Sequence, residues 1–161
     1  MKPRLLSPYL GSSEFCRSLV QQAPDAIIYA DIGGMIRFWN LGAERIFGFT
    51  EEEALEKSLN IIIPEDLRQR HWDAYNQTLQ TGVTRYGGGS VLAVSALRKD
   101  GTLVPVEFSI LPFKDRENRV LGVAAILRDV GKRFEELSSL RKEVALLRDH
   151  LASSVQRSSG P

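Results

Sequence analysis

The stretch Val104-Pro105-Val106-Glu107-Phe108-Ser109-Ile110 decides the fold, because it alternates apolar side chains with Pro, Glu and Ser. A period of two places successive side chains on opposite faces of a strand, so one face is buried and the other is polar. Pro105 has no N–H to donate to a neighbouring strand, which predicts an edge position or a bulge at that residue. The stretch therefore predicts one strand of a sheet that packs a single face against a core.

Turn signals on both sides of this strand predict further antiparallel strands. Asp100-Gly101 has the signature of a hairpin turn, and Gly33-Gly34 supplies the positive φ that another hairpin turn needs. The strands that the pattern predicts cover residues 26–30, 35–39, 91–97, 104–110 and 120–127. These strands together predict a five-stranded antiparallel sheet.

Helical stretches separate the strands. Thr50 and Glu53 form a capping-box pattern at the start of one helix, and Pro64 and Gly82 bound a longer one. The predicted helices cover residues 12–22, 40–49, 51–57 and 65–81. Short helices beside an antiparallel sheet define the α+β class, in which the helices wall a pocket against one face of the sheet.

The composition is that of an ordinary globular protein and excludes several function classes. The chain has 161 residues, of which 43% are hydrophobic and 25% charged, enough for one domain with tails. Its net charge of +1 does not favour direct nucleic-acid binding, and no apolar run reaches the roughly 18 residues of a membrane span. No signal peptide is visible, so we expect a cytoplasmic protein. No nucleophile elbow, phosphate loop or zinc-protease motif is present, so we expect no enzyme activity.

The C-terminal part reads as a long helix with a repeating apolar side. Its apolar residues are spaced 3, 4, 3 and 4 apart, which is the pattern of a coiled-coil seam over two heptads. The seam consists of Leu137, Leu140, Val144, Leu147 and Leu151. We expect a signalling helix over 132–152 that forms a homodimer, followed by a polar, disordered tail over 153–161.

Six short motifs follow one another between residues 15 and 131. They are Ala23-Pro24-Asp25-Ala26-Ile27, Ile36-Arg37-Phe38-Trp39-Asn40, Ala43-Glu44-Arg45-Ile46-Phe47-Gly48-Phe49-Thr50, Glu53-Ala54-Leu55, Arg98-Lys99-Asp100-Gly101, and Gly122-Val123 through Arg128-Asp129-Val130. Together they resemble the PAS domain family, although Gly131 stands where many relatives have threonine. The resemblance implies a PAS sensory domain over 12–131, with a cap helix before the sheet, after a flexible lead at 1–11. It also implies a non-catalytic role and an effector domain outside this chain.

The segment from Pro64 to Gly82 carries one of the two histidines of the chain. A neutral imidazole on a helix that faces an apolar cavity is the minimal protein part that holds a haem iron. The segment resembles the haem-binding PAS domains of rhizobial oxygen-sensing kinases of the FixL type. The resemblance implies haem b, with His71 as the axial metal ligand and Arg85 near a propionate. Val91 stands where those domains have an arginine that contacts oxygen, so carbon monoxide, nitric oxide and redox sensing stay open.

A haem site also needs an apolar box around its ligand. The cofactor-binding residues that we expect are His71, Arg85, Trp72, Tyr75, Ile63, Leu79, Val94 and Ile110. The apolar members of this set serve equally well as ordinary core. The alternative hypothesis is therefore a cofactor-free PAS module for dimerisation or for binding a small organic ligand, within a transcriptional regulator or a sensor kinase.

Overall fold

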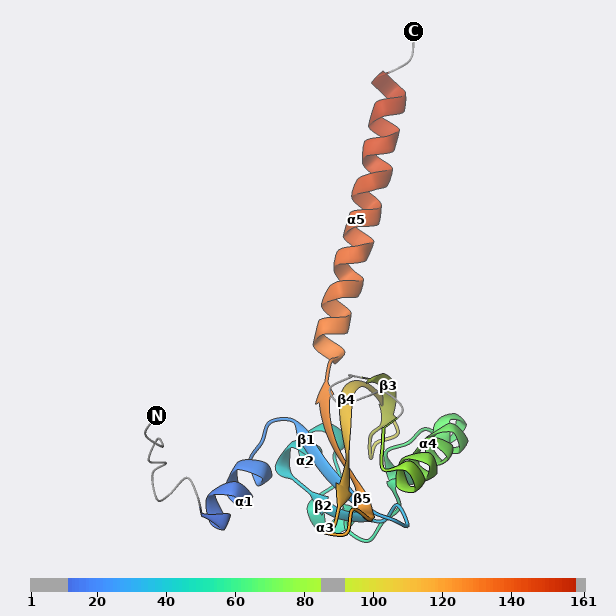
Figure 1. Cartoon of the computed structure of the whole chain (residues 1–161). Coiled ribbons are helices and arrows are strands. Elements are labelled where there is room, and N and C mark those ends of the chain that lie inside the picture. The colour runs from blue at the N-terminus through green and yellow to red at the C-terminus, as the bar shows by residue number, and fades with distance from the viewer. Residues whose placement is uncertain (1–11, 85–91, 159–161) are drawn as a thin grey trace, which may run out of the picture. The chain divides into compact units, whose positions relative to one another are not determined.

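The structure is a computed structural model that describes residues 12–84 and 92–158 (Figure 1). The chain divides into two compact units, one ending at Asp129 and one beginning at Val130. The first unit holds the sheet and the short helices, and the second holds the C-terminal helix. The expected lead at 1–11 and the side chain of Arg85 lie outside the described residues.

Five antiparallel strands form a single sheet, as the sequence predicts. They are β1 (Ala26–Asp31), β2 (Ile36–Trp39), β3 (Leu92–Leu97), β4 (Leu103–Lys114) and β5 (Val120–Asp129). Their order across the sheet is β2-β1-β5-β4-β3, and each neighbouring pair runs antiparallel. The first and the last strands in sequence therefore lie side by side, and the end of β5 lies beside the start of β1.

The longest strand, β4, explains how a proline is tolerated inside the sheet. Val104 and Val106 are each 1% exposed, which confirms that one face of this strand is buried. Pro105 lies opposite Ser95 of β3, but the ladder with β5 begins only at Val106. Pro105 thus lies where β4 has a single neighbour, so its missing N–H removes no bond from the β5 ladder.

The helices follow the sequence expectation with two corrections. They are α1 (Ser13–Gln21), α2 (Leu41–Phe47), α3 (Glu51–Ala54), the 3-10 turns η2 (Leu59–Ile61) and η3 (Glu65–Leu67), α4 (Arg68–Thr81) and α5 (Gly131–Ser158). The helix expected over 51–57 ends at Ala54, because Leu55 is extended and Glu56 has a positive φ of 61°. The helix expected over 65–81 begins instead as a 3-10 turn and becomes α-helical at Arg68.

One face of the sheet is buried under the short helices. Ala26, Ile28 and Ala30 of β1 point to this inner face and are at most 2% exposed. Trp39 and Phe47 are fully buried in the same core, with ring centroids 5.5 Å apart. Apolar side chains buried between a sheet and helices give the two-layer architecture that α+β patterning predicts.

Asn40 is a fully buried polar residue that ties three segments together. Its Oδ1 accepts hydrogen bonds from the backbone N–H groups of Ile27 and Ala43, at 2.8 and 2.9 Å. Its Nδ2 donates to the carbonyl oxygens of Val20 and Asp25, both at 3.0 Å. Asn40 is therefore the N-cap of α2 and also fixes the end of α1 beside β1.

Replacing Asn40 with alanine is expected to lower the unfolding free energy by about 3 kcal/mol, because buried donors and acceptors lose their partners. Urea unfolding would measure this change. Asn76, an exposed residue of α4, provides the matched control, and Asn76→Ala should change the unfolding free energy by less than about 0.5 kcal/mol. Equal effects of the two substitutions would contradict the role of Asn40.

The C-terminal helix α5 runs further than the sequence predicts. It extends to Ser158, so the expectation of a disordered tail from residue 153 is wrong for 153–158. Ala152, Gln156 and Arg157 favour helix, and the first helix breaker after the seam is Gly160. No helix within the described ranges is long and apolar enough to cross a membrane.

Candidate functional site

Three rings on α4 form an aromatic group beside the inner face of the sheet. The ring centroid of His71 lies 4.9 Å from that of Trp72, edge to face, and 5.8 Å from that of Tyr75. Trp72 and Tyr75 also meet edge to face at 5.5 Å. His71 and Tyr75 are four residues apart, so they share one face of the helix. The structure therefore brings the predicted ligand and its two aromatic neighbours together.

Tyr75 fixes α4 to the first strand. Its hydroxyl lies 2.6 Å from the carbonyl oxygen of Asp31 and 3.1 Å from that of Ala30, so it donates to the end of β1. The side chain is only 6% exposed. Burial, together with the nearby Asp31 charge, raises the pKa of Tyr75 above its ordinary value. Tyr75 thus stays a neutral hydrogen-bond donor and positions the helix that carries His71.

Trp72 is held against the first hairpin rather than aimed at open space. Its Nε1 donates to Oδ1 of Asn60 at 2.9 Å. Its ring packs on Gly34, where an added Cβ would lie 2.2 Å from the indole, and Gly34 also has a positive φ of 73°. Only glycine suits both conditions, so Gly34 lets the indole approach the turn closely. Trp72 therefore packs between α4 and the first hairpin.

His71 differs from Trp72 and Tyr75 in its hydrogen bonding. Its Nδ1 is buried and has no hydrogen-bond partner among the described residues. Burial lowers the pKa of His71 from 6.5 to about 4, so the imidazole is neutral at neutral pH. A neutral imidazole with a free ring nitrogen can bind a metal without first losing a proton. Buried polar atoms without partners are rare in folded proteins, and the described residues hold two of them, Nδ1 of His71 and Nε of Arg98.

The apolar residues expected around His71 divide into two groups. Ile63, Leu79 and Ile110 are partly buried and pack against the core that includes Tyr75. Val94 of β3 lies opposite the buried Val106, yet it is 43% exposed. Val94 is therefore on the expected face of the sheet but is not enclosed. Arg85, expected near a propionate, lies outside the described residues.

Asn60 and Gly34 hold the indole in place, a role that the sequence does not predict. Asn60 is on η2, and its backbone carbonyl also accepts a hydrogen bond from Arg68 at 3.4 Å. Neither residue lies in a motif with recognisable chemistry. The Gly33-Gly34 pair signals only a turn, and the indole contact depends on how α4 packs on that turn.

The stability of the haem-free protein is expected to fall in acid because of His71. The unfolded chain holds this residue at its ordinary pKa of 6.5, so the unfolded state takes up the proton first as the pH falls. Above pH 6.5 the imidazole is neutral in both states, and the free energy of unfolding keeps its full value. As the pH falls toward 4, the free energy of unfolding decreases progressively, by about 3 kcal/mol at most. Urea unfolding of the wild type and of His71→Leu across this range would isolate the effect. A pH-independent difference would contradict it.

Comparisons with known proteins identify the fold family. The family model described as PAS fold matches residues 14–130. Sensor protein FixL of Bradyrhizobium diazoefficiens is 38% identical over 94 residues, which are 58% of this chain and 18% of that protein. Oxygen sensor protein DosP of Escherichia coli is 26% identical over 120 residues, which are 74% of this chain and 14% of that protein. The chain thus spans less than a fifth of these relatives.

Solved structures agree with this assignment at the level of the fold. A PAS domain from Colwellia psychrerythraea is 22% identical with a TM-score of 0.65, covering 74% of this chain and 97% of that one. An RNA-binding light-oxygen-voltage receptor is 20% identical with a TM-score of 0.64, covering 90% of this chain and 40% of that one. This chain belongs to the PAS family, as the family match over most of the chain shows, in agreement with the five-stranded sheet and the helices on its inner face.

Proposed function

We propose that this PAS sensory domain binds haem b through His71 and acts as a gas or redox sensor. The observation that carries the proposal is the buried Nδ1 of His71, which has no partner within the described part of the chain. The similarity to Sensor protein FixL and to an oxygen sensor supports it, and it agrees with the resemblance of the Pro64–Gly82 segment to haem-binding PAS domains of the FixL type. When bound, haem would supply an iron that takes a gas ligand or changes oxidation state.

The side chains around His71 fit an axial ligand. Tyr75 anchors α4 at β1 and Trp72 anchors it at Asn60 of η2, so both fix the helix that carries the imidazole. Ile63, Leu79 and Ile110 supply partly buried apolar surface. Depression of the His71 pKa keeps the imidazole neutral, so protons do not compete with a metal at neutral pH.

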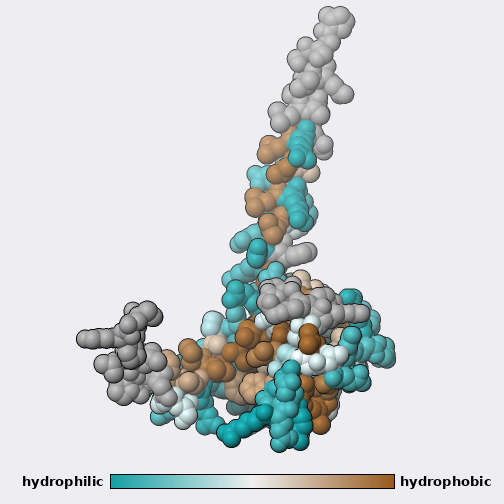
Figure 2. All heavy atoms as spheres, in the orientation of Figure 1, coloured by the Kyte–Doolittle hydropathy of each residue, from teal (hydrophilic) through white to brown (hydrophobic). Residues whose placement is uncertain are grey.

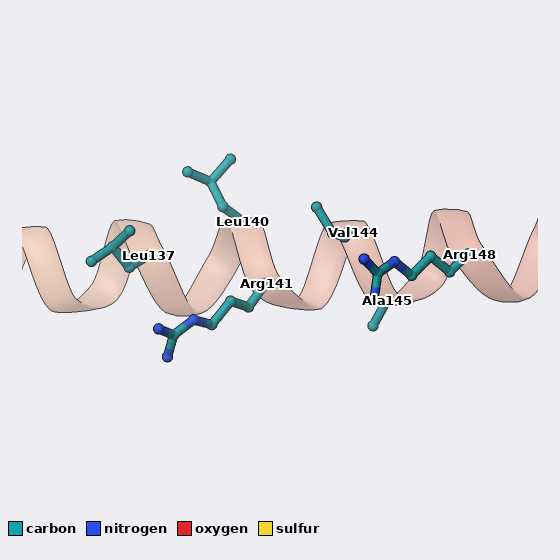
Figure 3. A pocket seen from close by; sticks show the side chains of 6 residues that line it. All are labelled: Leu137, Leu140, Arg141, Val144, Ala145 and Arg148. Atoms are coloured by element: carbon teal, nitrogen blue, oxygen red, sulfur yellow. The ribbon is translucent and has the colours of Figure 1, made fainter.

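The output of the domain is proposed to pass through α5 of two chains. Only Val130 separates β5 from α5, so the last strand leads directly into the helix. Leu137, Leu140, Val144 and Leu147 are 44–57% exposed, which leaves this part of the seam available to a partner (Figure 3). In a homodimer, the ligand-dependent structural change would be transmitted to an effector domain outside this chain, in the cytoplasm. Ligand must bind the two states with different affinity for this relay to work.

A cofactor-free role is the second candidate, and one observation favours it. The hydroxyl of Tyr75 and the indole N–H of Trp72 already have protein partners, so much of the aromatic group is complete without a cofactor. In that case His71 is a structural residue, and the domain serves dimerisation or binds a small organic ligand.

An absorbance titration of the purified chain with haemin tests the haem proposal. We expect saturable uptake of one haem per chain, with a sharp Soret band that shifts on reduction and again on adding carbon monoxide. A featureless spectrum without saturable uptake would refute the haem proposal and favour the cofactor-free role.

A further inference from the structure

The inner face of β4 ends in a positive charge. Alternation along the strand places on this face Val104, Val106, Phe108, Ile110, Pro112 and Lys114. Phe113 lies on the outer face, where its ring meets that of Tyr29 edge to face at 5.7 Å. Lys114 pairs with Val120 at the start of β5, so it lies at the end of the sheet away from Asp129. An apolar surface with a cation at its rim suits a ligand that has an apolar body and an acidic edge.

The ammonium group of Lys114 rests against the C-terminus of α4. A Cβ built on Gly82 would lie 2.8 Å from Nζ and 2.9 Å from Cε of Lys114, so these atoms approach the helix end closely. Gly82 is the C-cap of α4, with a φ of 64°, and its N–H donates to the carbonyl oxygen of Thr78 at 2.9 Å. The last carbonyl groups of a helix carry a partial negative charge, which attracts a lysine even without a carboxylate partner.

This helix end belongs to the face of α4 that carries the proposed iron ligand. At spacings of 4, 3 and 4, one face of the helix carries His71, Tyr75, Thr78 and Gly82. Tyr75 and Thr78 are buried, so this face is turned toward the core. Gly82 follows His71 by eleven residues, or roughly 16 Å along the helix axis. The flexible four-carbon stem of Lys114 lets its ammonium group reach back along this face toward a group bound at His71.

Lys114 is available to bind an anion. It is exposed and makes no ion pair with any residue that the structure describes. Figure 2 shows hydrophilic side chains at the lower end of the first unit, the end at which β5 begins in Figure 1. The acidic neighbours Asp115 and Glu117 both pair with Arg119, at 2.7 and 3.0 Å. Helix carbonyl groups repel an anion at a C-terminus, so a cation such as Lys114 is needed there to offset them.

We infer that Lys114 binds a propionate of the haem, and that the propionate edge faces the end of the sheet where β4 joins β5. The inference rests on the proposed function and names the group that holds the acidic edge of the ligand. Haem carries two propionates, so Arg85, the anchor that the resemblance implies, leaves one of them without a partner. Arg85 follows Gly82 by three residues, at most about 11 Å of chain, so both cations belong to the same end of α4.

A comparison of haemin with its dimethyl ester tests the role of Lys114. The ester has the same ring and iron, but its propionates are uncharged and cannot form the ion pair. Lys114→Gln should weaken haemin binding about fivefold, as expected for an exposed ion pair, and should leave the affinity for the ester within about twofold of the wild-type value. Lys114→Arg keeps the charge and should bind haemin as the wild type does. Soret titrations measure these affinities, and high salt should reduce the effect of Lys114→Gln on haemin.

Lys57 provides the matched control. It is exposed, and its carbonyl oxygen accepts a hydrogen bond from Ile36 of β2, an edge strand that β1 and β5 separate from β4. Lys57→Gln should leave the affinities for haemin and for the ester unchanged. Thermal unfolding shows that both glutamine variants are folded. If Lys114→Gln loses affinity for haemin and for the ester equally, its role is structural and the inference is overturned.

The outcomes separate failure of the anchor from failure of the haem proposal. If the wild type takes up haemin and Lys114→Gln binds it with unchanged affinity, the haem proposal stands and the assignment of Lys114 is wrong. If the wild type takes up neither haemin nor the ester, the haem proposal fails and the inference fails with it.

Discussion

Replacing His71 with alanine is expected to abolish haem binding while the domain stays folded. The imidazole is the proposed axial ligand, so its removal should weaken haem affinity by at least about 100-fold. Folding should survive, because the lost Nδ1 has no hydrogen-bond partner in the described structure and its burial is a cost rather than a gain. Soret absorbance during a haemin titration measures the affinity, and thermal unfolding confirms that the variant is folded.

The other histidine of the chain provides the matched control for this experiment. His150 belongs to α5, in the other compact unit, and His150→Ala should bind haem as the wild type does. Added imidazole should partly restore the Soret band of His71→Ala, because it can occupy the space that the side chain leaves. Unchanged haem affinity in His71→Ala would show that this residue is not the ligand.

Local rules account for much of the fold. The capping box at Thr50 forms in both directions, since Thr50 N–H donates to Glu53 and Glu53 N–H donates to Thr50. The period of two in β4 correctly assigned Val104 and Val106 to the buried face. Both features depend on residues within a few positions of one another, which is the range that a single sequence reveals.

Contacts between distant segments account for what the sequence could not reveal. The hydrogen bond from Trp72 to Asn60 and the close approach of the indole to Gly34 exist only after α4 packs on the first hairpin. Val94 shows the same limit of prediction from a single sequence. Its face in the sheet follows from alternation, but its exposure depends on which segment covers β3, and periodicity does not contain that information.

The extent of α3 was also decided by tertiary contacts. Glu56 adopts a positive φ and pairs with Arg37 of β2, and its N–H donates to Ile36. These contacts with the second strand replace the last helical turn that the sequence predicts. Helix propensity is a weak preference, so interactions with a neighbouring strand outweigh it.

Placing lysine at both Leu140 and Leu147 is expected to convert a dimer into monomers. Each leucine that a dimer buries contributes roughly 1.5–3 kcal/mol, and a symmetric pair of helices loses four of them. The lysines would also bring like charges together at the centre of the seam. The dissociation constant should therefore rise by more than about 1,000-fold. Sedimentation equilibrium of the full chain measures it directly.

Leu146 supplies the matched control, because it is 60% exposed on the same helix but occupies heptad position c, away from the seam. Leu146→Lys should leave the dissociation constant within about threefold of the wild-type value. The monomeric double variant should still bind haem, since His71 and its neighbours belong to the other compact unit. A double variant that stays dimeric would place the interface outside the seam. Loss of haem binding on dissociation would instead mean that ligand binding and dimerisation are coupled, which is what a relay between them requires.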